Sequence, residues 1–209
     1  MKRILFYVWY VLWPLIPVIL YIQSSGTEWN QYSLSVVLGI YAFIWLCNQF
    51  ILAAKPKLLS PILGAKGILN LHSIMPVVII ILAALHRIMK AAYGFSLETA
   101  QARLGGLAWW LYALIIVFTL LFMANTKLMH IGLLKRLKDF VYAKTGLTYK
   151  RARVFHNFTV LGAFIILVHM GLASSSQITM NPLGTAFLLI WMLFSLALYL
   201  RYRLRGRNA

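Results

Sequence analysis

Four histidines lie in two apolar segments of the sequence, and their spacing suggests metal chemistry inside a membrane. His72 and His86 are 14 positions apart, and His156 and His169 are 13 positions apart. In an α-helix, each pair spans roughly 20 Å of a hydrocarbon core that is about 30 Å thick. Ionisable side chains are costly in such a core and mark functional sites. Because neutral imidazole binds transition metals, two such helices side by side could hold two metal centres, one near each membrane face.

Haem is the metal group that this pattern favours, because haem iron accepts one or two axial nitrogens from the protein. Two facing histidines would fill both axial positions and leave no open site for oxygen, which suits electron transfer. Zinc and di-iron sites need more protein ligands at one point, often carboxylates, and the predicted spans contain no acidic residue. The competing interpretation is a set of interfacial histidines bound to water or lipid headgroups. His130 has no partner at a matching depth, and we assign it no ligand role.

The composition places these segments in a membrane protein. Hydrophobic residues make up 62% of the chain and charged residues 11%, and the mean hydropathy is +0.83. A single domain, residues 1–209, has room for about six crossings. Hydropathy predicts an all-α integral membrane bundle of six helices: Ile4–Ile22, Leu34–Ala53, Leu71–Met89, Leu107–Asn125, Phe155–Leu172 and Leu183–Leu200. We expect the first helix to be retained, because no small-residue cleavage pattern interrupts it.

The basic residues predict how the bundle is oriented. All but Arg87, Lys90 and Arg103 of the 20 Lys and Arg residues fall on one side of the predicted membrane, and Glu28 and Glu98 lie on the other side with these three. By the positive-inside rule, both termini are predicted to be cytoplasmic. A net charge of +17 would suggest nucleic acid in a soluble protein, but the loops of a membrane protein account for it. We expect a lipid membrane and no nucleic acid as partner.

The orientation pairs the histidines across the chain. The third and fifth helices both run outward, so His72 faces His156 near the cytoplasmic side and His86 faces His169 near the outer side. Fourteen residues are nearly four helical turns, which puts His72 and His86 on one face. Thirteen residues leave His156 and His169 about 140° apart, so their helix must be distorted or present them to different sides. Gly162 lies between them and would allow a bend or a close ring approach.

Three further features have two interpretations each. Arg87 adjoins His86 and is predicted to bind a haem propionate on the outer side, against ordinary snorkelling, with Lys90 and Arg103 as weaker candidates. The basic stretch from Lys135 to Arg153 predicts an amphipathic surface helix followed by a turn at Gly146. It would bind an acidic electron donor or a flavin phosphate, or else anionic lipid. The single cysteine, Cys47, is expected to be a packing residue.

The residues around the four histidines resemble those of a known family. The segments Leu71-His72-Ser73, Leu85-His86-Arg87, Phe155-His156-Asn157 and Val168-His169-Met170 are similar to the ferric reductase-like transmembrane domain. NADPH oxidases, ferric-chelate reductases and bacterial relatives share this domain. The resemblance covers essentially the whole chain and rests on the four histidines and the six-helix topology. It implies two b-type haems between the third and fifth helices, an oxidoreductase role and a place in the plasma (bacterial inner) membrane.

The resemblance also predicts the partners. NADPH oxidases and ferric reductases continue into a cytoplasmic flavin and nicotinamide domain, whereas this sequence stops at Ala209 and has no G-x-G-x-x-G motif. We therefore expect a cytoplasmic flavoprotein or a quinol to supply electrons. The outer acceptor would be ferric chelate, flavin, oxygen or a partner protein. Two alternatives stay open: a non-redox membrane scaffold or transporter with structural histidines, and a redox protein with one haem.

Overall fold

The computed structural model describes residues 1–25, 29–122, 130–145 and 149–205, which are helical with short connections and contain no strand. The helices are α1 Lys2–Leu12, α2 Leu15–Ser25, α3 Gln31–Ala54, α4 Ser60–Ala92, α5 Ala100–Phe122, α6 Gly132–Thr145, α7 Tyr149–His156, α8 Phe158–Gly171, the short 3-10 helix η2 Ser174–Ser176, and α9 Pro182–Arg205. Glu28 and Gly146, which the sequence interpretation used, lie outside the described residues.

Six helical stretches within the described ranges are long and apolar enough to cross a membrane, which confirms the predicted number. The first of them consists of α1 and α2, which a turn at Trp13 and Pro14 separates. Proline cannot donate a backbone hydrogen bond, so a helix breaks readily at this point. The third, α4, begins at Ser60, well before its predicted start, and is bent at Gly64. There the backbone takes φ 67° and ψ 163°, which glycine adopts without strain.

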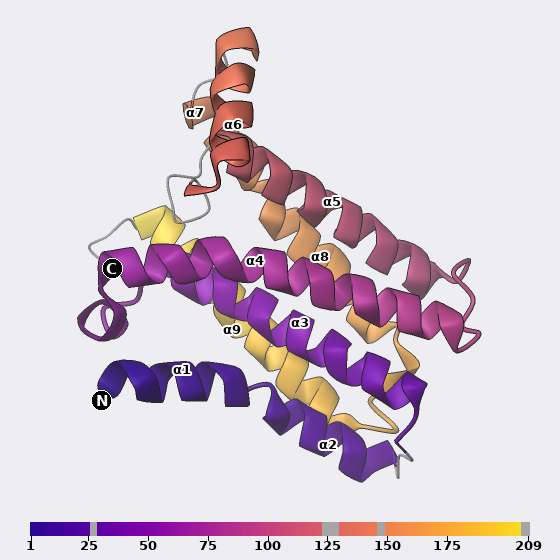
Figure 1. Cartoon of the computed structure of the whole chain (residues 1–209). Coiled ribbons are helices and arrows are strands. Elements are labelled where there is room, and N and C mark those ends of the chain that lie inside the picture. Colours follow the sequence, from indigo (N-terminus) through magenta and orange to yellow (C-terminus); the bar gives the residue numbers. More distant parts are fainter. Residues whose placement is uncertain (26–28, 123–129, 146–148, 206–209) are drawn as a thin grey trace.

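The bundle is built from two helix pairs that lie next to each other. In the first pair α3 packs along α4, and in the second α5 packs along α8; α4 also contacts α5. α9 packs on the other side of α3, as Figure 1 shows. The core between α3 and α9 contains fully buried Ile44, Cys47 and Met192, with 3.8 Å between Cys47 Sγ and Met192 Sδ. The predicted packing role of Cys47 is confirmed.

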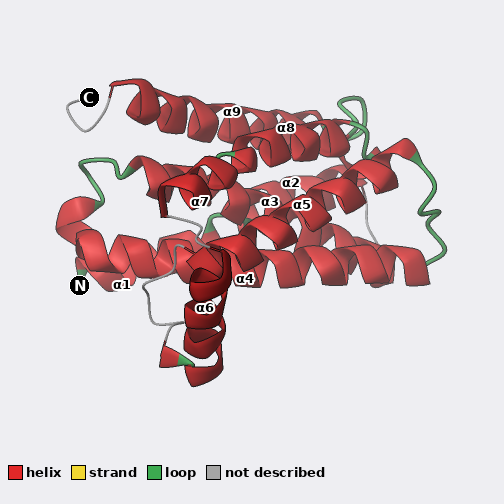
Figure 2. Cartoon of the chain, turned by 90° about the horizontal axis from the view of Figure 1, so that it is seen from above, coloured by secondary structure: helices red, strands yellow, loops and turns green. Residues whose placement is uncertain are grey.

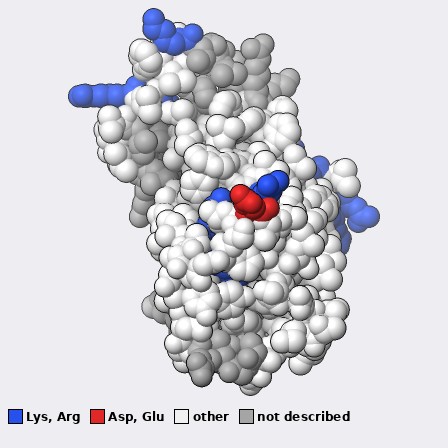
Figure 3. Space-filling view, turned by 90° about the vertical axis from the view of Figure 1, so that its right-hand side faces the viewer, with Lys and Arg blue, Asp and Glu red and all other residues white. Residues whose placement is uncertain are grey.

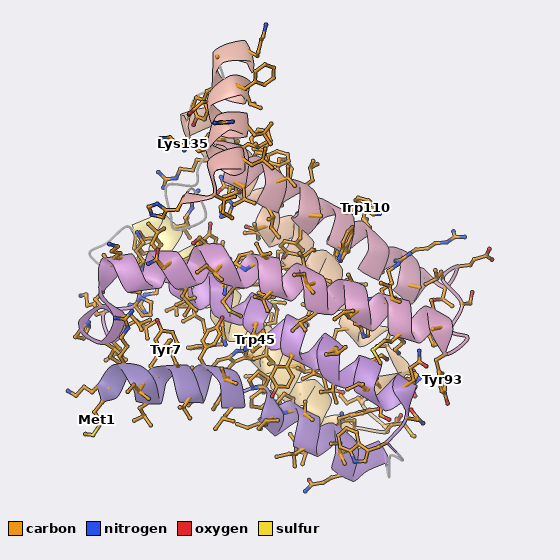
Figure 4. All side chains as sticks on the ribbon, viewed as in Figure 1. Met1, Tyr7, Trp45, Tyr93, Trp110 and Lys135 are labelled. Atoms are coloured by element: carbon orange, nitrogen blue, oxygen red, sulfur yellow. The ribbon has the colours of Figure 1, made fainter. Side chains whose placement is uncertain are left out.

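The first span is held to α3 by polar contacts inside the bundle. The indole Nε1 of Trp45 donates to the Tyr10 carbonyl oxygen at 3.1 Å, and Gln49 Nε2 donates to the Tyr10 hydroxyl at 3.1 Å. Figure 4 shows Trp45 on the side of α3 that faces α1 and α2. Buried polar groups are costly unless they are hydrogen-bonded, so these contacts fix α1 against α3.

One amphipathic helix stands apart from the bundle. Figures 1 and 2 show that α6 projects away from the other helices, and Figure 4 shows Lys135 on it. It carries four basic residues and one acid: Lys135, Arg136, Lys138, Lys144 and Asp139. The helix predicted from the basic stretch is therefore present, although it ends before the second basic segment, α7. Figures 1 and 2 also show that α1 begins and α9 ends on the same side of the bundle.

The outer surface of the bundle is mostly apolar. Trp110 on α5 is 69% exposed and Ile190 on α9 is 63% exposed, and Figure 4 shows Trp110 pointing away from the bundle. The face in Figure 3 is largely uncharged, with one acidic patch beside basic atoms near its centre and further basic atoms at its edges. Such a surface, around helices that satisfy their own backbone hydrogen bonds, is compatible with a multi-pass membrane protein.

Candidate functional site

The structure brings the four histidines together in two pairs. The ring centres of His72 and His156 lie 6.2 Å apart, and those of His86 and His169 lie 6.4 Å apart. The two rings of each pair are nearly perpendicular, at 81° and 88°. These are the pairs that depth in the membrane predicts from the sequence. All four rings line one cavity of about 820 Å³.

The spacing within each pair fits a metal ion between the two rings. A metal ion lies about 2 Å from a ligating imidazole nitrogen and the ring centre about 1.1 Å further, so two rings on opposite sides of one ion have centres about 6.2 Å apart. The measured distances agree with this value at both levels. Two rings in direct van der Waals contact can have the same spacing. The hydrogen bonds of the rings therefore matter too, because they show which ring nitrogen is free to bind a metal ion.

We call His86 and His169 the outer pair and His72 and His156 the inner pair, after the topology predicted from the sequence. The outer pair is held through the Nδ1 atoms. His86 Nδ1 lies 2.6 Å from the carbonyl oxygen of Ser35 on α3, and His169 Nδ1 lies 2.8 Å from the carbonyl oxygen of Gln101 on α5. A carbonyl oxygen only accepts, so Nδ1 carries the proton in both rings. This leaves Nε2 of each ring unprotonated, with a lone pair to bind a metal ion. Hydrogen bonds of this kind orient the histidine ligands of metal sites.

The inner pair is held differently. His156 Nδ1 lies 3.2 Å from the Thr119 hydroxyl on α5, a group that either donates or accepts. His72 Nδ1 is buried and makes no hydrogen bond of good geometry, although it interacts with the backbone of Gln49 on α3. The rings of the inner histidines are therefore held by weaker hydrogen bonds than those of the outer histidines.

A turn interrupts the fifth span next to His156, and both histidines of this span line the cavity. α7 ends at His156 and α8 begins at Phe158, and Asn157 N bonds back to the Val154 carbonyl at 3.0 Å in a tighter turn. The turn lies within the 13 residues that separate His156 from His169, but one tighter turn supplies only about 20° of the roughly 140° that a regular helix leaves between them. Gly162 allows a close ring approach, one of the two roles expected of it, because the ring of Tyr112 lies against it.

Two cations line the outer part of the cavity. Arg87, which the sequence analysis placed beside His86, lines the cavity. Its Nη1 donates to the Ala102 carbonyl oxygen at 3.3 Å. Lys90 is only 5% exposed, and its Nζ lies 4.3 Å from the ring centre of Tyr32 and 4.7 Å from that of Phe95. No carboxylate among the described residues pairs with Lys90. A buried cation without an acid suits an anionic ligand, which makes Lys90 a stronger candidate than Arg103, which is exposed.

Four more cations line the cavity near the inner pair. They come from four separate segments: Lys55, Lys138, Arg153 and Arg203. Arg203 on α9 also donates through Nη2 to Asn157 Oδ1 at 3.0 Å, next to His156. The cavity thus has basic side chains beside both histidine pairs. The haem group carries two carboxylates, so its charge suits either part of the cavity.

The donor set of each pair suits haem better than a bare ion. In the described part of the chain, no three side chains of His, Cys, Asp or Glu come together to hold a metal ion. Each pair offers two nitrogens, and haem iron accepts one or two ligand atoms from a protein, so each pair would suffice for one haem. His130, to which no role was assigned, is exposed. Comparison with protein-family models, curated proteins and solved structures gives no match.

Proposed function

We propose that this protein carries electrons across a membrane through two b-type haems, one held by His72 and His156 and the other by His86 and His169. The observation that carries the proposal is the spacing of 6.2 and 6.4 Å between paired ring centres at two levels of one cavity. When bound, haem iron supplies reversible one-electron oxidation and reduction. Two histidines would hold each haem, which would suit electron transfer better than oxygen binding.

The other residues of the cavity bind and shield the group. Apolar side chains such as Ile79 and Ile115 exclude water, and a low dielectric strengthens the attraction between cations and carboxylates. Arg87 and Lys90 bind anionic groups on the outer side. The deep burial of Lys90 supports a direct contact with a ligand carboxylate.

The direction of electron transfer depends on which side of the bundle is cytoplasmic, and the basic residues indicate that side. We infer that α6 and both termini are cytoplasmic, by the positive-inside rule, and that the membrane is the bacterial inner membrane. Electrons would then enter at the His72/His156 level from a flavoprotein or a quinol. They would leave at the His86/His169 level to ferric chelate, flavin, oxygen or a partner protein. The resemblance to the ferric reductase-like transmembrane domain supports this assignment as an oxidoreductase subunit.

Spectroscopy of purified protein tests the proposal. Protein from haem-replete cells should show the visible bands of reduced b-type haem and contain two haems per chain. His86→Ala or His169→Ala should remove about half of the haem, and His130→Ala, at an exposed position, should remove none. A colourless wild-type protein would refute the proposal in favour of a scaffold or transporter. Unchanged haem content in His86→Ala and His169→Ala would leave a one-haem protein.

A further inference from the structure

A glycine lies against each histidine of the outer pair. His86 contacts α3 at the Ser35 carbonyl oxygen, and Gly39 stands four residues later on the same helix. A Cβ atom at position 39 would lie 2.9 Å from His86 Nδ1 and 3.0 Å from its Cε1. The first contact is shorter than real Cβ atoms make and the second is at the limit, so a larger residue at position 39 would displace the ring.

The second outer histidine repeats this arrangement on another helix. His169 contacts α5 at the Gln101 carbonyl oxygen, and Gly105 stands four residues later. A Cβ atom at position 105 would lie 2.8 Å from His169 Cε1 and 2.9 Å from its Nδ1. The next glycine, Gly106, has the same relation to Arg87 and the Ala102 carbonyl, because a Cβ atom at position 106 would clash with Arg87 Nη1.

Helix geometry explains the interval of four residues. The Cα–Cβ bonds of a helix tilt toward its N-terminus, so each side chain covers the backbone one turn before it. The carbonyl oxygen of residue i already accepts from the N–H of residue i+4, and the side chain of that residue shields it from other donors. A glycine at i+4 removes the shield. A donor on a neighbouring helix then shares the carbonyl oxygen.

The inner pair has no glycine four residues after a contacted carbonyl. His72 interacts with the backbone of Gln49, and the residue four positions later is Ala53. His72 Nδ1 makes no hydrogen bond of good geometry. His156 uses the Thr119 hydroxyl in place of a carbonyl. The presence of glycine thus coincides with the short carbonyl bonds, and its absence with the weaker anchors.

We propose that Gly39 and Gly105 are positioning residues that open two helix carbonyls and so hold His86 and His169 in the Nδ1–H form. An Nδ1–H bond to a carbonyl oxygen raises the basicity of Nε2. A more basic axial ligand stabilises ferric iron over ferrous iron and lowers the reduction potential. The lowering of the reduction potential rests on the proposed haem function. It would apply to the outer haem, whose histidines donate to carbonyl oxygens, and not to the inner haem.

The test compares four alanine variants. Gly39→Ala adds a Cβ atom that blocks the Ser35 carbonyl oxygen, and Gly105→Ala adds one that blocks the Gln101 carbonyl oxygen. The controls are Gly67→Ala on α4, where a Cβ atom would lie at an ordinary 3.4 Å from Leu63 Cβ, and Gly171→Ala, where nothing lies within 4 Å. In haem-free protein labelled with ¹⁵N-histidine, each of the first two variants should lose one Nδ1–H histidine signal by NMR, and the controls should lose none. Unchanged signals in both variants would overturn the proposal.

A variant without any steric clash keeps the test decisive if the alanine variants fail to fold. Ala53→Gly should uncover the Gln49 carbonyl and give His72 an Nδ1–H signal that the wild type lacks. In haem-loaded protein it should lower the potential of one haem, whereas Gly39→Ala or Gly105→Ala should raise the potential of the other. The absence of a new signal in Ala53→Gly would refute the role of the fourth residue. Because the NMR measurement needs no haem, a haem-free wild type would refute the proposed function alone.

Discussion

Gly162 provides a stability test that is independent of any cofactor. The Tyr112 hydroxyl donates to the Thr159 carbonyl oxygen at 2.9 Å, and its ring lies directly over Gly162. An alanine Cβ atom at position 162 would be 2.7 Å from Tyr112 Cζ and 2.9 Å from its Cε2. The ring is rigid and its hydroxyl is bound, so the α5–α8 contact must open or Tyr112 must turn into the cavity.

The size of the effect follows from two contributions. Overpacking of this kind costs about 1–3 kcal/mol, and loss of the Tyr112–Thr159 hydrogen bond costs about 1 kcal/mol more. Gly162→Ala should therefore lower the free energy of unfolding by about 2–4 kcal/mol. For a chain of this length, that corresponds to a fall in Tm of roughly 4–16 °C.

Thermal unfolding in detergent, followed by helix circular dichroism, measures this difference against Gly171→Ala, which adds a methyl group to open space at the end of the same helix. In a Tyr112→Ala background the cost of Gly162→Ala should nearly vanish, because the clashing ring is gone. Equal stability of Gly162→Ala and Gly171→Ala would refute the packing argument. An undiminished cost in the Tyr112→Ala background would show that the clash lies elsewhere.

Two further predictions concern charge and orientation. Lys90→Met should weaken the retention of one haem by about 1.5–3 kcal/mol, or roughly 10- to 150-fold, whereas Arg103→Met should not; equal haem retention in both would remove Lys90 from the site. A membrane-impermeant thiol reagent should label Ser96→Cys on intact cells and Lys135→Cys only after lysis, with little background from buried Cys47. The reverse labelling pattern would invert the proposed orientation.

The sequence predicted features that depend on position along the chain. Hydropathy located six apolar helices, and the depth of the histidines paired His72 with His156 and His86 with His169, because depth needs only a count of residues from a span's end. The pairing did not need the rotation of each helix about its axis, which a count of residues leaves open.

Other features depend on neighbours that lie far away in the chain. The early start of α4 was missed, because the hydropathy boundary at Leu71 gave no sign of the helical segment before it. Lys90 was ranked below Arg87, since only the folded chain puts it between Tyr32 and Phe95. The carbonyls of Ser35 and Gln101 have no signature in composition. Gly105-Gly106 was the available signal, but its meaning required knowing that His169 and Arg87 pack against it.

The division of the bundle into an α3–α4 pair and an α5–α8 pair has a consequence for biosynthesis. Each proposed haem site takes one ligand from α4, which leaves the ribosome early, and one from the α7–α8 segment, which follows much later. A half-made chain offers only single histidines and cannot clamp a planar group from both sides. Firm haem retention would therefore report that membrane insertion of α8 is complete, and chains truncated before it would be left as colourless intermediates for quality control.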